Sequence, residues 1–238
     1  MVTKRLFVFF LLSFGLVAHA RAKDDALLAA IEKLQQAGSY TWRTEVVLTP
    51  GVPAIMEGRF SSVQGLHLKI TAGKNTVELA ARSGVVVAKT DDEWKPVKKF
   101  TRSDIDHTMV RELRDFKLPH LDLARVQGAW RAGRKNTAEH FEGQVSLGEA
   151  RKLLSTSIRQ AGALQFASLS PDFCNAVVHI VGGLPDRLII QSKLSGSQGV
   201  LAAQSVQLLV STRFSNIGST QVQLPPEAEA AILAAKLP

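Results

Sequence analysis

Alternation of apolar and polar residues with a period of two runs through most of the sequence and constrains its fold more than any other feature. In the stretch 40–48, Tyr40 and Trp42 fall on one face of an extended strand, whereas Arg43 and Glu45 fall on the other. Strands of this kind pack one side on a core and leave the other in water, which is typical of antiparallel sheets. The pattern therefore predicts a sheet with two chemically different faces.

The same alternation recurs in further segments, at 55–61, 66–71, 77–81, 85–88, around Trp94, and at 138–145, 176–181, 187–194 and 205–214. Gly65, Gly73 and Gly84 separate the first of these segments. Turn signals repeated at intervals of roughly ten residues are characteristic of an antiparallel meander.

Four segments instead repeat their apolar residues every three or four positions, as amphipathic helices do. They are 24–36, 103–116, 147–160 and 225–237. In the first segment the apolar stripe consists of Leu27, Leu28, Ile31 and Leu34. Few helices and many one-faced strands predict an α+β fold, in which a large curved antiparallel sheet carries amphipathic helices across its concave face.

The beginning of the sequence has the organisation of a secretory signal peptide. Two basic residues precede the apolar run 6–17, and Ala18-His19-Ala20 presents small residues where signal peptidase reads them. The run is shorter than the roughly 20 residues of a membrane-spanning helix, and an N-terminal anchor is the alternative. We expect residues 1–20 to be a signal peptide, residues 21–238 to form a single domain, and the mature protein to be exported and soluble in the periplasm.

The net charge is positive, with 29 Lys and Arg against 21 Asp and Glu. Because two of the basic residues lie in the first 20, the chain without them carries +6. Such an excess favours anionic lipid headgroups, acidic glycans or nucleic acid. The basic residues are scattered, however, and the absence of a basic run with interleaved aromatic residues argues against nucleic acid. A solvated surface is the simplest interpretation.

The densest basic cluster contains Lys95, Lys98, Lys99 and Arg102. Its three lysines are candidates for steering anionic headgroups.

The single cysteine, Cys174, cannot form an internal disulfide, and it has no histidine or cysteine at metal-binding or redox spacing. An isolated cysteine of this kind behaves as a small buried hydrophobe. We therefore expect an inert thiol, no metal site and no cofactor.

The closing part of the sequence, VQLLVSTRFSNIGSTQVQLPPEAEA, resembles the ending of the LolA-like and LppX/LprG-like lipoprotein and lipid carriers. In those families a last alternating strand runs into a Gly-(Ser/Thr)-Thr turn, a short strand and a Pro-x-Glu-Ala helix start. The stretch SYTWRTEVVLTP, the EGRF that opens the next strand and the segment DDEWKPV agree with the same layout. The segment FEGQVSLGEARKLL has the strand-then-helix order of their middle section.

The resemblance implies an unclosed β-barrel, or half-barrel, with helices as a lid over an apolar cavity that receives acyl chains. It also implies a non-enzymatic periplasmic carrier or binding protein for a lipid or for the acyl chains of a lipoprotein, in transient contact with a membrane or with membrane proteins. The candidate ligand-binding residues are those on the apolar faces of the strands: Tyr40, Trp42, Val46, Leu66, Leu68, Ile70, Val77, Leu79, Leu188, Ile190, Val206, Leu208, Val210 and Phe214.

Two other functions stay open. A structural or partner-binding module of the envelope would use the same fold with a filled core, because fold alone does not determine function. An enzyme would use Asp104 with His107, or His120 with Asp122, as an acid–base or metal pair. Asp104 and Asp106, however, fall in the first turn of an expected helix, where carboxylates stabilise the helix dipole. No hydrolase, zinc-protease or phosphate-loop motif occurs, so no catalytic residue is assigned.

Overall fold

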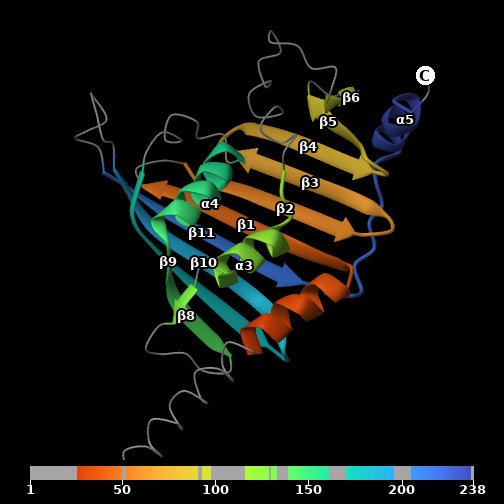
Figure 1. Cartoon of the computed structure of the whole chain (residues 1–238). Coiled ribbons are helices and arrows are strands. Elements are labelled where there is room, and N and C mark those ends of the chain that lie inside the picture. The colour runs from red at the N-terminus through yellow and green to blue at the C-terminus, as the bar shows by residue number, and fades with distance from the viewer. Residues whose placement is uncertain are drawn as a thin grey trace, which may run out of the picture.

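The computed structural model describes residues 26–49, 52–90, 93–97, 116–128, 130–132, 139–160, 170–195 and 205–236. Eleven strands of these residues form one open antiparallel sheet in the order β6-β5-β4-β3-β2-β1-β11-β10-β9-β8-β7 (Figure 1). The strands of its first half are β1 Ser39–Thr49, β2 Ala54–Ser61, β3 Gly65–Ala72, β4 Asn75–Arg82, β5 Val85–Thr90 and β6 Glu93–Pro96. Those of its second half are β7 Trp130–Ala132, β8 His140–Val145, β9 Ser170–Val181, β10 Leu184–Ser195 and β11 Ser205–Ser215.

Two meanders make up this sheet, and they meet where β1 pairs with β11. Each meander is built from neighbours in sequence, whereas the central pair joins residues 41–49 to residues 207–215. The edge strands β6 and β7 lie at opposite ends of the strand order, so the sheet is not closed. The predicted α+β half-barrel is thereby confirmed.

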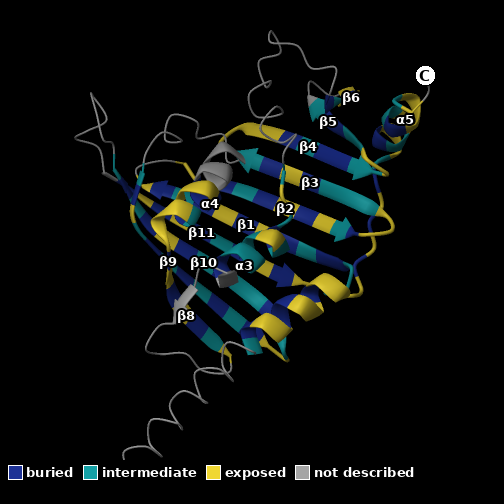
Figure 2. Ribbon diagram, viewed as in Figure 1, coloured by how far each residue is buried: buried dark blue, intermediate teal, exposed yellow. Residues whose placement is uncertain are grey.

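Three helices cover one face of the sheet, here called the inner face because Tyr40 and Trp42 project from it. They are the N-terminal helix, residues 26–36, α3 Pro119–Gly128 and α4 Leu147–Gln160 (Figure 1). The main hydrophobic core lies between these helices and the strands. Figure 2 shows buried residues alternating with less buried ones along the strands, as the period of two predicts.

The opposite, outer face is covered differently. The fourth described helix, α5 Pro226–Ala234, lies against β4, β5 and β6. Its Ala228 and Ile232 form a second, smaller core with Ala80, Val87 and Trp94, which project from the outer side of those strands. The C-terminal helix therefore does not join the covering of the inner face, and no other described helix lies on the outer face.

Most predicted elements are confirmed, and the differences have local causes. β9 starts at Ser170 rather than at 176, because the strand continues through Pro171 at a register irregularity opposite β10, where a proline is tolerated. In the N-terminal helix, Leu28 is 39% exposed and Ala30 is buried in its place. The predicted helix 103–116 lies outside the described residues except for Phe116.

Helix α3 and strand β7 were not predicted. The buried residues of α3 up to Val126 are Pro119, Leu123 and Val126, so its sequence, PHLDLARVQG, lacks a long apolar stripe. β7 has three residues, too few to show a period of two.

Gly58 has a packing role that only the structure reveals. It lies on β2 directly opposite Trp42 of β1, so the two residues share the inner face. The indole ring lies across the glycine, where an added Cβ would overlap it, and stacks on Phe116 with the ring centroids 6.1 Å apart. The ring thus connects the centre of the sheet to the segment that leads into α3.

Replacing Gly58 by valine is expected to destabilise the protein by at least about 2 kcal/mol, because the new side chain must displace a buried indole. Chemical denaturation measures this loss. Gly148→Ala is the matched control, since nothing lies within 4 Å of its Cβ position. Gly148 is exposed on α4, so alanine there should be neutral or stabilising by up to about 1 kcal/mol. A Gly58→Val protein as stable as the wild type would contradict this packing.

Candidate functional site

The structure places the fourteen predicted ligand-binding residues on the inner face of the sheet. All of them except Leu66 are buried, and Leu66 is partly buried against the same core. Most of them pack against other core residues in the manner of an ordinary interior. Four of them, Trp42, Leu188, Ile190 and Val210, line a cavity between the centre of the sheet and the beginning of α3. A ligand-binding role for the set stays a prediction.

This cavity has a volume of about 20 Å3. A volume of this size holds about one water molecule. Besides the four predicted residues, its lining comprises Thr44, Met56, Phe116, Lys117, Pro119, Asp122 and Thr212. Its floor is the inner face of β1, β2, β10 and β11, and its roof is Phe116 with the start of α3. The cavity is therefore mostly apolar, with two threonines in its floor and Lys117 and Asp122 in its roof.

A pair of threonine hydroxyls forms one polar part of the lining. Thr44 and Thr212 are direct cross-strand partners on β1 and β11. Each is 4% exposed, and their Oγ1 atoms are hydrogen-bonded at 2.8 Å. Because a hydroxyl has one donor and two acceptor positions, this single bond leaves acceptor positions free for a further partner in the cavity.

Asp122 of α3 is the second polar group, and its burial is only partly compensated. Its Oδ1 is buried without a hydrogen-bond partner, and it forms a loose ion pair with Nη1 of Arg125, 3.8 Å away. Burial raises the pKa of this carboxyl to about 6, although the charges of Arg125 and Lys117 oppose the rise. The side chain thus brings a carboxyl that is readily protonated to the edge of an apolar cavity.

Tyr40 and His120 fasten the beginning of α3 to β1. The Tyr40 hydroxyl and Nδ1 of His120 are hydrogen-bonded at 2.7 Å, and the two rings meet edge to face. Burial raises the pKa of the tyrosine hydroxyl and lowers the pKa of the histidine. A neutral histidine is therefore the expected partner of the tyrosine, which makes this contact a structural fastening of α3.

The enzymatic alternative gains nothing from this geometry. His120 bonds to Tyr40, whereas Asp122 lines the cavity, so the two residues serve separate contacts. Asp104, Asp106 and His107 lie outside the described residues. Within the part of the chain that is described, no group of three or more His, Cys, Asp or Glu side chains could hold a metal ion. Cys174 is buried as expected, and burial raises the pKa of its thiol to about 11.

Thr44 and Thr212 were missed as site residues, and Asp122 was considered only as a partner of His120 in the enzymatic alternative. The threonines carried a signal, because each occupies a position where the alternating pattern demands an apolar residue. Thr44 stands between Trp42 and Val46, and Thr212 stands between Val210 and Phe214. A polar residue at the centre of the apolar face of a strand marks a place where something polar must be met. The position of Asp122 at the cavity had no such signal, since its helix was not predicted.

Comparison with known proteins finds a distant structural similarity and no similarity to a protein-family model or a curated protein. No protein-family model matches the chain, and no curated protein matches it. Several solved structures are similar to the chain. One of them, the crystal structure of LprF from Mycobacterium bovis, is similar over 87% of this chain and 97% of its own, with a TM-score of 0.43 and 9% sequence identity. LprF is an LppX/LprG-family lipoprotein, the group that the sequence resembles. At this identity and TM-score the likeness carries no argument about function.

The described helices also bear on membrane insertion. None of them is long and apolar enough to cross a bilayer.

Asp122→Asn is expected to stabilise the protein at neutral and alkaline pH. The folded-state pKa of about 6 lies above the ordinary value of about 3.9, so the stability of the wild type falls as pH rises between these values and stays lower above them. Asparagine removes this penalty, and the variant should gain about 3 kcal/mol over the wild type at pH 8 and almost nothing near pH 4.

Urea denaturation at several pH values measures this difference, with Glu32→Gln on the exposed face of the N-terminal helix as the control. A variant that is less stable than the wild type at pH 8 would contradict the account. It would mean that the helix dipole stabilises an ionised Asp122 in the first turn of α3.

Proposed function

We propose that this protein is a non-enzymatic carrier or binding protein for a lipophilic ligand, either a lipid or the acyl chains of a lipoprotein, and that it acts in the periplasm after export. The observation that supports the proposal is the cavity beneath α3. It combines an apolar floor at the centre of a large sheet with polar groups that have unused hydrogen-bonding capacity.

Apolar burial would provide the driving force. Each buried methylene contributes about 0.8 kcal/mol, so roughly ten methylenes of an alkyl chain would contribute about 8 kcal/mol before the costs of ordering. The chain would lie along the inner face over Leu188, Ile190 and Val210. The polar end of the ligand would be met by the hydroxyls of Thr44 and Thr212 and by Asp122.

Loading would require the roof of the cavity to move, because about 20 Å3 admits no alkyl chain. Helix α3 is the element suited to this movement. Two fully buried apolar side chains, Leu123 and Val126, and the Tyr40–His120 hydrogen bond hold it against the inner face. Burial raises the pKa of the Asp122 carboxyl, so its ionisation opposes this closed position and lowers the free energy that opening needs.

A structural or partner-binding module is the second candidate, and one observation favours it. Thirteen of the fourteen predicted ligand-binding residues are buried, and the cavity that four of them line has a volume of only about 20 Å3. If this packing is permanent, the protein presents only its surface to partners. Ligand content distinguishes the two functions.

The test is to purify the protein under mild conditions, extract it with organic solvent and identify the extract by mass spectrometry. A charged substitution on the apolar face, for example at Leu68, would not test ligand binding. Leu68 is 0% exposed, so a charged side chain there would unfold the protein. Val210→Phe fills the cavity instead, and Val181→Phe is the control, since Val181 is 66% exposed. We expect near-stoichiometric lipid in the wild type and the control, and at least tenfold less in a folded Val210→Phe protein.

A lipid-free wild type that also takes up no fluorescent fatty acid and no fluorescent monoacylglycerol would overturn the carrier function. It would leave the partner-binding module in its place.

Tyr40→Phe is expected to accelerate loading without abolishing it. The change removes the hydroxyl that fastens α3 and leaves the ring, so the closed position should lose about 1 kcal/mol. Stopped-flow uptake of a fluorescent monoacylglycerol should become about fivefold faster. Thr41→Val, which removes a hydroxyl bonded to Ser215 on the outer face, is the control. Unchanged uptake by the Tyr40→Phe protein would exclude α3 as the moving element.

A further inference from the structure

The outer face of the sheet brings together arginines that are far apart in the sequence. Arg187 of β10 is the direct cross-strand partner of Arg213 of β11, and Arg213 is the partner of Arg43 of β1. All three side chains project from the outer face, since their strand neighbours Leu188, Thr212 and Thr44 belong to the inner one. We call Arg187, Arg213 and Arg43 the arginine row.

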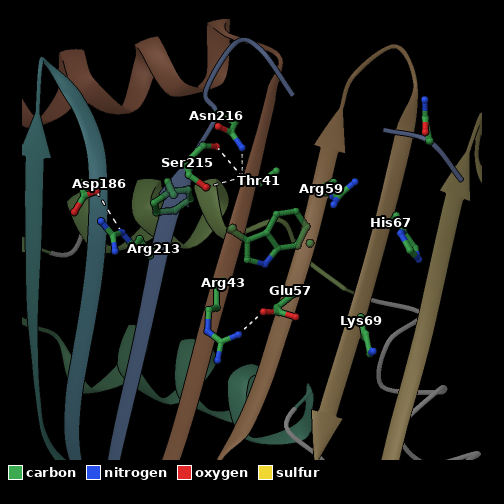
Figure 3. A pocket seen from close by; sticks show the side chains of 14 residues that line it. Thr41, Arg43, Glu57, Arg59, His67, Lys69, Asp186, Arg213, Ser215 and Asn216 are labelled. Carbon is green, nitrogen blue, oxygen red and sulfur yellow. Dashed lines mark hydrogen bonds and ion pairs between the residues drawn. The ribbon is translucent and has the colours of Figure 1, made fainter. Parts of the chain in front are cut away.

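Further basic side chains extend the row in both directions. Beyond Arg187, the cross-strand partners continue with His179 and then His140, whose rings are 4.9 Å apart. On the other side, Arg59 of β2 and Lys69 of β3 point into the same open groove as Arg43 and Arg213 (Figure 3). Register thus assembles a basic surface that the scattered sequence positions did not indicate.

The acidic residues of this surface do not balance its cations. Arg43 forms an ion pair with Glu57, and Arg213 forms a looser one with Asp186 at 3.7 Å. Within the described residues, neither Arg59 nor Lys69 has an ion-pair partner. Arg43, Arg59, Lys69 and Arg213 line the groove together with the carboxylates of Glu57 and Asp186. Glu78, the cross-strand partner of Lys69, adds a third carboxylate beside the groove, so four cations against three carboxylates leave a net charge of +1.

Arg187 provides independent evidence that this surface binds an anion. Its Nε is buried and has no hydrogen-bond partner. A buried donor without a partner is costly, and like charges in directly opposite cross-strand positions destabilise a sheet. Three arginines in consecutive positions therefore weaken the fold at its centre, and an anionic partner would offset this cost. The planar guanidinium group is suited to paired hydrogen bonds with the oxygens of a phosphate.

The shape of the surface fits an extended partner rather than a small molecule. The groove has a volume of about 1050 Å3 and crosses β10, β11, β1, β2 and β3. Five strands about 4.8 Å apart span roughly 20 Å. Figure 3 shows the labelled side chains on the open side of the sheet, with the helices behind it. The covered part of the outer face, under α5, lies farther along at β4, β5 and β6.

We propose that the arginine row, with Arg59 and Lys69, docks the protein on an anionic membrane surface by binding the phosphate groups of phospholipids. The site lies on the opposite face from the cavity under α3 and does not depend on the proposed ligand. Most of the predicted headgroup-steering cluster lies outside the described residues. Of that cluster only Lys95 is described, and it pairs with Glu93 at 2.9 Å.

Co-sedimentation with vesicles tests the proposal. The full protein should bind vesicles of equal parts phosphatidylcholine and phosphatidylglycerol and should not bind vesicles of phosphatidylcholine alone. Its binding should weaken as the salt concentration rises. The variant Arg43→Gln/Arg59→Gln/Arg213→Gln should lose about a hundredfold in partitioning, because each basic residue near an anionic surface contributes about a factor of five. Its circular dichroism and thermal midpoint verify folding, since exposed ion pairs add little stability.

The matched control is Lys33→Gln/Lys74→Gln/Lys236→Gln, which removes the same charge from exposed positions away from the row. This control should keep most of the binding. An equal loss in both triple variants would overturn the proposal in favour of a general charge effect. Two other results would also overturn it: stabilisation by inorganic phosphate without vesicle binding, which indicates a small-anion site, or preference for a single-stranded oligonucleotide over the vesicles, which indicates a nucleic-acid surface.

Discussion

The pairing of β1 with β11 is the contact on which the rest of the structure depends. It is the junction between a meander formed early in the chain and one formed late, and its register brings together residues about 170 positions apart. Residues 41–46 of β1 and 207–213 of β11 have strand partners on both sides, because β2 and β10 continue the sheet. Pairing of strands this far apart in the sequence lowers the conformational entropy of the long segment between them. Burial of the large apolar face that the two meanders share must offset this entropy loss.

The register of β1 against β11 determines which residues lie together on each of the two faces of the sheet. On the inner face it pairs Trp42 with Phe214 and Thr44 with Thr212, so an aromatic wall and a hydroxyl pair lie side by side. On the outer face, one residue along, it pairs Arg43 with Arg213. A shift by one residue would exchange the faces and bury the arginines. The polar lining of the cavity and the basic groove are therefore consequences of the same alignment of strands.

The period of two was sufficient to predict the sheet, its apolar face and the fourteen residues on that face. It was not sufficient to predict the order of the strands, because the alternating pattern of one strand does not indicate which strands pair with it. For this reason the basic residues looked scattered, although register collects Arg43, Arg187 and Arg213 in a row. Helix α3 escaped prediction because it has no long apolar stripe, and for this reason Asp122, considered only as a partner of His120, was not placed at the cavity. The threonines of the cavity were visible as polar interruptions of an apolar face, a signal that requires no structure.

The central claim is that α3 is a cover that opens over an otherwise stable sheet. Native-state hydrogen exchange, resolved by residue, tests it most directly, because it separates local opening from global unfolding. The account predicts that amides of α3 exchange through an opening of several kcal/mol less than the global value shown by β1 and β11, and that added lipid slows them. Exchange of α3 only at the global unfolding free energy, with or without lipid, would contradict it.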